Sequence, residues 1–314
     1  MNEFSRRNAL KSSAFAGVAG VAGAGAGGMA TGSRKRRVTT YVFVTGANGG
    51  TSADSELALR GHRTVAVELP GHGSADTQFR ASYQAPQDLR ALASEPSIMA
   101  GVTLDDYVKA TVATVRRAAA HGPVILVGGS MGGVTITKAA DAVPDLIDHL
   151  VYDSAFCCTE LPSADSYLST PEGSPTQVGA LLAGVLADPA TIGAVRINWR
   201  TADPAFLGPV KAALMADGSD AEFMAMLNGS LPDDSPLIAT ADARGRKEAW
   251  GRVPRTYIRH SEDRLIPIAL QNRMIREADA LTPGNRFNVR TVRCAHAPAR
   301  AAWAKIVDIL DGLA

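Results

Sequence analysis

A serine between glycines is the residue of this chain whose surroundings point most directly to chemistry. Ser130 lies in the sequence G-G-S-M-G-G at residues 128–133, directly after the apolar run 124–127. A strand that turns sharply into a helix lifts a serine hydroxyl above the edge of a sheet, and flanking glycines relieve the close contacts of such a turn. Amides at the start of that helix stabilise developing negative charge. The pattern predicts that Ser130 is a nucleophile.

A serine hydroxyl is an effective nucleophile only beside a base, and His296 stands where a base is required. It is the one histidine, of six in the chain, between the last expected strand and the last expected helix. The others precede Ser130, begin a strand or lie among the acidic candidates. We therefore expect His296 to take the proton of Ser130.

The histidine needs an acid that orients its ring, and the chain order serine, acid, histidine is typical of this arrangement. Asp263 follows the strand expected at 255–259 and is the acid that we favour. Its neighbour Glu262 is an alternative. Asp153, at the end of the strand expected at 149–152, is another.

The glycine-rich loop at residues 45–50, T-G-A-N-G-G, permits two interpretations. It is similar to the dinucleotide-binding loop of short-chain dehydrogenases, with Glu68 as a ribose ligand. However, Thr51 and Ser52 stand where a further glycine should open a helix, and the chain has no Tyr-x-x-x-Lys pair. Beside a nucleophilic serine, the same loop supplies an oxyanion hole in which the amides of Ala47 and Met131 bind the substrate oxygen.

Strand-like and helix-like segments alternate around these residues. Short apolar runs predict strands at 38–45, 63–69, 124–127, 149–152, 255–259 and 286–292. Helical patterns lie at 104–120, 133–142, 267–280 and 299–313. This order predicts an α/β fold with a mostly parallel central sheet flanked by helices on both faces.

The alternation stops between residues 159 and 246. Helix-like pieces occur at 178–186 and 221–227, with scattered Pro and Gly and no clear strand. Because this segment is too long for a connecting loop, we expect a helical cap inserted over the active site. The core would then comprise residues 34–158 and 247–314.

The N-terminus carries a twin arginine, Arg6-Arg7, before an Ala/Gly-rich stretch at 12–30. This resembles a twin-arginine export signal over residues 1–30, and it implies a secreted protein. Alanine and glycine contribute little transfer energy, so stable membrane insertion after signal cleavage is not expected.

Charge and cysteine content exclude other classes. The chain has 32 basic and 31 acidic residues, which gives no electrostatic basis for nucleic-acid binding. Cys157, Cys158 and Cys294 are too few for a disulfide framework, so buried free thiols are expected, with a bridge from Cys294 as the alternative. No cluster has metal-ligand spacing, and no metal or organic cofactor is implied. The oligomeric state stays open.

Six motifs together resemble the α/β-hydrolase superfamily, in particular the branch of plant methylesterases and hydroxynitrile lyases. They are T-G-A at 45–47, L-P-G-H-G-S at 69–74, G-G-S-M-G-G at 128–133, Y-D-S-A-F at 152–156, S-E-D-R-L-I-P at 261–267 and C-A-H at 294–296. The resemblance implies the α/β-hydrolase fold, a catalytic triad of Ser130, Asp263 and His296, and an oxyanion hole at Ala47 and Met131.

One departure bears on the reaction. Ala297 follows His296 where the cyanohydrin-cleaving members carry a lysine, which favours hydrolysis of a small carboxylic ester through an acyl-serine over lyase activity. An amidase or a lactonase would use the same residues. A homologue that binds a ligand without turnover is the non-enzymatic alternative.

Overall fold

The computed structural model describes residues 38–73 and 79–314. The export signal predicted at residues 1–30 lies outside this part of the chain. None of the helices within it is both long and apolar enough to cross a lipid bilayer.

Six parallel strands form the central sheet, in the order β2-β1-β3-β4-β7-β8. They are β1 (Thr40–Val44), β2 (Arg63–Ala66), β3 (Val124–Gly129), β4 (His149–Asp153), β7 (Arg255–His260) and β8 (Asn288–Val292). Each coincides with a strand expected from the sequence, which confirms the predicted α/β architecture. The register pairs Gly129, at the end of β3, with Asp153, at the end of β4. The carboxyl ends of the central strands therefore meet at one edge.

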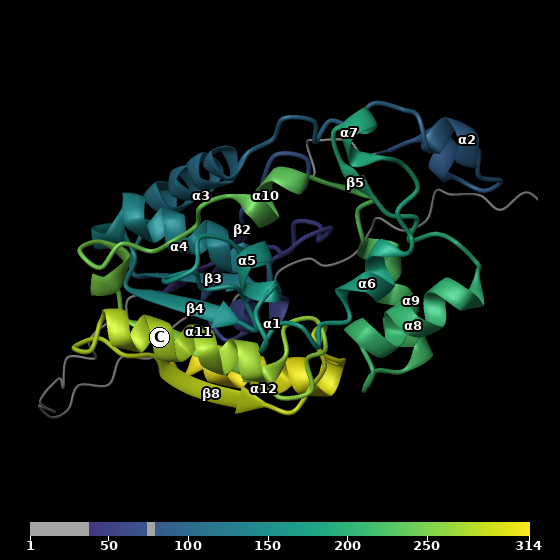
Figure 1. Ribbon diagram of the computed structural model, residues 1–314. Helices are drawn as coiled ribbons and strands as arrows, with labels where there is room; N and C mark the ends of the chain where they lie inside the picture. The colour runs from purple at the N-terminus through teal and green to yellow at the C-terminus, as the bar shows by residue number, and fades with distance from the viewer. Residues whose placement is uncertain (1–37, 74–78) are drawn as a thin grey trace, which may run out of the picture. The chain divides into compact units, whose positions relative to one another are not determined.

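Helices cover both faces of the sheet (Figure 1). On one face α1 (Ser55–Leu59) and α12 (Arg300–Asp311) pack over inward residues such as Ile125 and Ile258. On the other face lie α3 (Leu104–Ala119), α4 (Gly132–Ala142) and α11 (Ile268–Leu281). Both faces of the inner strands are thus buried, and this explains their continuous apolar runs. All four core helices expected from the sequence are present.

Local signals account for the longest of these helices. Thr103 and Asp106 form a capping box at the start of α3, each side chain accepting from the backbone amide of the other. Arg116 and Arg117 lie in its last turn, where positive charge interacts favourably with the helix dipole. The buried residues of α3 recur at helical spacing, so one stripe of the helix packs on the sheet.

The segment between β4 and β7 is built mainly from short helices (Figure 1). They are α5 (Ala164–Leu168), α6 (Val178–Leu182), α7 (Pro189–Ile192), α8 (Pro204–Leu214), α9 (Asp220–Gly229) and α10 (Pro236–Thr240). The expectation of no strand here was wrong, because β5 (Val195–Arg196) pairs antiparallel with β6 (Asp233–Asp234). Strands of two residues are too short to show an alternating pattern in sequence. A further short helix, α2 (Leu89–Leu92), precedes α3.

Tertiary contacts, above all a buried ion pair, hold these two strands. The Arg196 guanidinium donates from Nε to Oδ1 of Asp233 at 2.6 Å and from Nη2 to Oδ2 at 2.7 Å, and both side chains are fully buried. Ser97 and Arg80 donate to the same carboxylate at 2.6 and 2.8 Å. Burial raises the pKa of Asp233, but the hydrogen bonds from Arg196 and Ser97 and the neighbouring positive charges outweigh it, and the pKa lies below its ordinary value.

We expect Asp233→Ala to destabilise the protein by about 3–5 kcal/mol, because it leaves the buried Arg196 charge without its carboxylate. Urea unfolding monitored by circular dichroism measures the loss. Asp242→Ala is the matched control, since Asp242 pairs with Arg244 on the surface with both side chains about half exposed. Its effect should be several times smaller, and equal losses would contradict the assignment.

The difference between wild type and Asp233→Ala should also depend on pH. A carboxyl whose pKa is lowered by folding contributes stability above its unfolded pKa of about 4 and loses it as pH falls through the folded value. The difference should therefore be full near neutrality and shrink below about pH 4.

Candidate active site

The nucleophile elbow lies where β3 turns into α4. Ser130 adopts a φ of 51°, in the left-handed region that non-glycine residues seldom occupy. Its amide donates to the carbonyl of Asp153 at 3.3 Å, and its own carbonyl accepts from Gly133 at 3.2 Å and from Phe156 at 3.0 Å. Neighbouring backbone on both sides therefore maintains the strained turn.

Close packing explains several of the glycines around Ser130, and Gly128 and Gly132 are two of them. A Cβ at Gly132 would lie 2.5 Å from the carbonyl oxygen of Val44, and one at Gly128 would lie 2.8 Å from that of Gly132. Both obstacles are backbone atoms, which cannot rotate away. At Gly129, by contrast, an added Cβ would meet only the Asp153 oxygen, at 3.8 Å. The turn thus requires glycine at positions 128 and 132 but not at 129.

The structure brings together the three residues expected to form the triad. His296 Nε2 lies 3.0 Å from the Oγ of Ser130, and His296 Nδ1 lies 2.6 Å from Oδ2 of Asp263. Because a carboxylate only accepts, Nδ1 carries the proton, and in the neutral ring Nε2 is left to accept from the Ser130 hydroxyl. This is the geometry of a serine activated by an oriented base.

The carboxylate of Asp263 is buried and accepts four hydrogen bonds. Besides His296, its Oδ2 accepts from Ser154 Oγ at 2.6 Å, and its Oδ1 accepts from the amides of Leu265 and Ile266 at 2.7 and 2.8 Å. Burial raises the pKa of Asp263, but the electrostatic interaction with His296 and these hydrogen bonds outweigh it and hold the pKa below its ordinary value. Asp263 is therefore ionised at neutral pH.

Ser154 is a functional residue that the sequence reasoning missed. It is buried at the end of β4 with a φ of 39°, and its hydroxyl orients the acid rather than the base. Its only signal in the sequence is its position directly after Asp153, within the Y-D-S-A-F motif. Nothing in that position shows that the side chain meets a residue over a hundred positions later.

Neither alternative acid contacts His296. Glu262 is partly exposed and accepts from Arg293 Nε at 2.6 Å. Asp153 pairs instead with His260, whose Nε2 lies 2.8 Å from Oδ1. Ser154 directly follows β4 with a left-handed backbone, and its hydroxyl meets Asp263, whereas the Asp153 carboxylate meets His260.

The two residues expected to donate to an oxyanion lie beside Ser130. Ala47 and Met131 line the same cavity as Ser130 and His296. Within the part of the chain that the structure describes, neither amide donates a hydrogen bond. Met131 is the N-terminal cap of α4, and Gly46 brings the other loop so close that an added Cβ would lie 2.8 Å from that of Ser130. Both amides are thus available to a ligand.

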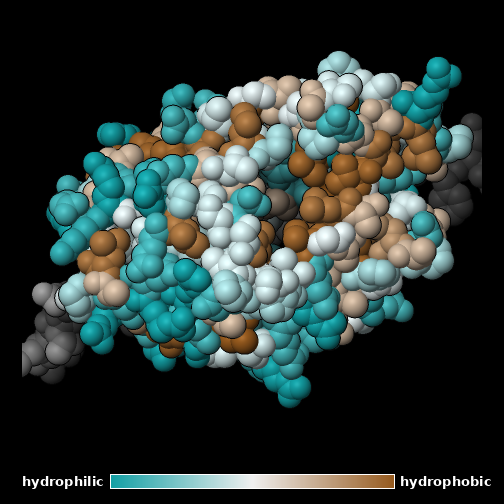
Figure 2. Space-filling model, in the orientation of Figure 1, coloured by the Kyte–Doolittle hydropathy of each residue, from teal (hydrophilic) through white to brown (hydrophobic). Residues whose placement is uncertain are grey.

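A cavity of 540 Å³ opens at this site, between the core and the inserted segment. Figure 2 shows a hollow on this face with hydrophobic residues along one side. Most of the lining is apolar, including Phe156, Trp199 and Met226. Its two acidic residues are Asp165 and Asp234, and none of the described residues that line it is lysine or arginine.

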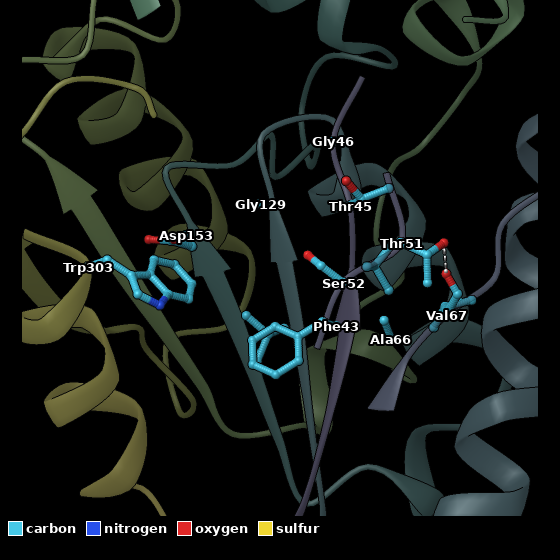
Figure 3. Close-up of a pocket in the computed structure, with 12 residues that line it drawn as sticks. Phe43, Thr45, Gly46, Thr51, Ser52, Ala66, Val67, Gly129, Asp153 and Trp303 are labelled. Atoms are coloured by element: carbon cyan, nitrogen blue, oxygen red, sulfur yellow. Dashed lines mark hydrogen bonds between the residues drawn. The ribbon is translucent and has the colours of Figure 1, made fainter. Parts of the chain in front are cut away.

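A second cavity of 190 Å³ lies behind the elbow and does not reach Ser130 Oγ or His296. Figure 3 shows it between Phe43 of β1, Asp153 of β4 and Trp303 of α12. Of these two cavities, the larger is therefore the one that gives a ligand access to Ser130 and His296.

The cysteines and the possible metal ligands also bear on the chemistry of this chain. Cys157, Cys158 and Cys294 are all buried free thiols. Within residues 38–73 and 79–314, no three His, Cys, Asp or Glu side chains are grouped so that they could hold a metal ion.

Comparison with known families agrees with this geometry. The model of the alpha/beta hydrolase family matches residues 41–309. The chain belongs to this family. An alpha-hydroxynitrile lyase from Arabidopsis thaliana is 30% identical to this α/β hydrolase over 221 residues, which are 67% of this chain and 72% of that protein.

Solved structures show the same fold at lower sequence identity. A pyrethroid hydrolase from Sphingobium faniae JZ-2 superposes with a TM-score of 0.60 at 22% identity, covering 87% of this α/β hydrolase and 98% of that chain. Polyneuridine aldehyde esterase gives a TM-score of 0.54 at 19% identity, covering 87% and 99%. An extracellular alpha/beta-hydrolase from a Paenibacillus species gives 0.55 at 19%, covering 86% and 98%.

The unequal packing around the elbow glycines generates a prediction about stability. Gly132→Ala should cost at least about 2 kcal/mol of unfolding free energy, because its Cβ is forced against the backbone of β1. Gly129→Ala, three positions before Gly132, has room for the methyl group and should cost much less. Thermal and urea unfolding of both variants checks this, and equal destabilisation would show that the turn packs differently.

Proposed function

We propose that this α/β hydrolase is a serine esterase that cleaves an uncharged, largely apolar carboxylic ester. The observation that carries the proposal is the unbroken hydrogen-bond chain from Ser130 through His296 to Asp263 at an apolar cavity. Each residue faces the partner that such a reaction requires.

The proposed reaction begins when Ser130 Oγ attacks the ester carbonyl carbon as His296 Nε2 takes the hydroxyl proton. The tetrahedral intermediate collapses to an acyl-serine, and the alcohol leaves with the proton from His296. A water molecule then gives a proton to the same nitrogen and attacks the acyl carbon, which releases the acid and restores Ser130. Throughout, Asp263 keeps the ring in the Nδ1–H tautomer and stabilises the imidazolium.

The oxyanion of the intermediate would lie between the Ala47 and Met131 amides. Those two donors have no other partner within the described residues, so they need not break a hydrogen bond to bind the substrate. Donors that are already oriented before the reaction stabilise the transition state more than the ground state.

The cavity lining supports the substrate class. A volume of 540 Å³ is within the usual range for small-molecule sites, and its apolar walls stabilise an acyl or alkyl group by burial. An anionic substituent would meet the carboxylates of Asp165 and Asp234 with no lining cation to compensate. Neutral esters should therefore be preferred over esters of dicarboxylic acids.

The Arabidopsis relative favours a second candidate, cleavage of a cyanohydrin. That reaction must stabilise cyanide as it departs. Ala297 lines the cavity next to His296, and the described lining carries no lysine or arginine. The ester reaction, which needs no cation at this position, fits the residues better.

Fluorophosphonate labelling of the purified protein tests the proposal, with turnover of p-nitrophenyl esters from acetate to octanoate measured beside it. Wild type should label and turn over, and Ser130→Ala and His296→Ala should lose about 10⁴-fold or more of the turnover. An aromatic cyanohydrin, an anilide and a lactone are assayed in parallel. Cleavage of one of these with no ester turnover would reassign the reaction, and saturable ligand binding without labelling would identify a non-enzymatic homologue.

The identity of the acid is tested by two adjacent substitutions. Asp263→Asn should lower kcat by about 10⁴-fold, because an amide at this position no longer holds His296 in the required tautomer. Glu262→Gln, the matched control, should change kcat by less than about twofold, since its side chain points to Arg293. Comparable losses would exclude Asp263 as the specific partner of His296.

A further inference from the structure

The inserted segment is hydrogen-bonded to the loop that carries the Ala47 amide. The backbone carbonyl of Asn48 accepts from the amide of Leu231 at 2.8 Å, and the Asn48 side-chain Nδ2 donates to the Leu231 carbonyl at 3.0 Å. Gly49 and Ser230 form an antiparallel bridge next to these bonds. Residues 230–234 therefore extend along the loop as a short strand would.

Asn48 needs such support because of its backbone conformation. Its φ is 55°, in the left-handed region, and glycines occupy positions 46, 49 and 50 around it. A loop of this composition has many accessible conformations when it is free. Contacts from other parts of the chain must therefore select the loop conformation in which Ala47 faces Ser130.

The carboxylate of Asp234 makes the shortest of those contacts. Its Oδ2 accepts from the Asn48 amide at 2.6 Å, and its Oδ1 accepts from the amide of Ser235 at 2.7 Å. The side chain is only 10% exposed. Behind it, His72 Nδ1 donates to the Gly49 carbonyl at 2.7 Å, and His72 Nε2 lies 2.7 Å from the Tyr107 hydroxyl.

Asp233, the residue before Asp234, anchors β6 on the opposite face of the strand. Asp233 and Asp234 are consecutive in β6, so their side chains point to opposite faces. Asp233 pairs with buried Arg196, while Asp234 faces the loop. The strand that holds Asn48 is thus itself anchored by an ion pair.

We propose that Asp234 is a positioning residue that orients the Ala47 amide in the oxyanion hole. The carboxylate fixes the peptide between Ala47 and Asn48, and this restricts the rotation of the preceding peptide, whose N–H faces the substrate oxygen. The inference rests on the proposed esterase reaction. It implies that the inserted segment cannot lift from the loop without dismantling the oxyanion hole.

The test compares Asp234→Ala with Asp220→Ala, a control on the same inserted segment. The Asp220 side chain is 85% exposed and pairs with Lys211 on the surface. Hydrogen exchange of the peptide spanning residues 44–52 reports the loop directly, and p-nitrophenyl ester kinetics report the oxyanion hole. In Asp234→Ala the Asn48 amide should exchange at least about tenfold faster.

Turnover by Asp234→Ala should fall about 10- to 100-fold, with KM changed less than about threefold. Outright loss of an oxyanion donor costs about 10²–10³-fold, and here the donor is displaced rather than removed. If Asp234→Ala does not fold, Asp234→Asn carries the test. In wild type the Asn48 and Ser235 amides bind two different oxygens, and the single oxygen of the substituted amide side chain can occupy only one of these positions. About a 3- to 10-fold loss of kcat is therefore expected.

The outcomes separate this inference from the proposed function. Wild-type protein that neither labels nor cleaves any ester overturns the esterase and the positioning role with it. Active wild type with an Asp234 variant of unchanged kcat, or unchanged exchange at 44–52, overturns the positioning role alone. A fall in kcat shared by Asp220→Ala, or an equal rise in KM, would also overturn it, because a general loss of packing would then explain the effect.

Discussion

The rest of the site depends on the tight turn at Ser130. A positive φ at a serine is unfavourable on its own, and it persists because the turn is packed from three directions. Gly132 lies against the end of β1, the carbonyl of Ser130 accepts from Gly133 and Phe156, and its amide donates to the end of β4. One local constraint thereby places the Ser130 hydroxyl, the Met131 amide and the loop after β1 next to each other.

The buried carboxylate of Asp263 is the second constraint. Removing a charge from water is costly unless donors replace the lost solvation. Four hydrogen bonds supply that replacement, two from side chains and two from the backbone of the turn that follows the residue. The same bonds orient the carboxylate, so the stability of the ionised form and the alignment of His296 have one physical cause.

The segment inserted between β4 and β7 both lines the cavity and binds the core. Its helices supply the apolar wall of the cavity, whereas its two short strands are joined to each other and to the core by charged groups. Asp233 pairs with Arg196 of the neighbouring strand and with Arg80 of the core, and Asp234 binds the loop at Asn48. Hydrophobic burial and hydrogen bonding are thus divided between different parts of the segment. An apolar wall can adapt to different substrates, but a carboxylate aimed at a backbone amide tolerates little displacement.

The sequence by itself determined the alternating order of strands and helices and the parallel sheet, and it singled out Ser130, His296 and three possible acids as candidates. These follow from local patterns: apolar runs, glycines at a turn and the place of each residue after a strand. The choice among Asp263, Glu262 and Asp153, the role of Ser154, the requirement at Gly132 but not Gly129, and the contact of Asp234 with Asn48 were decided only by the tertiary structure. Each depends on the direction of a side chain and on backbone atoms distant in the chain, and neighbouring letters of a sequence do not encode that direction.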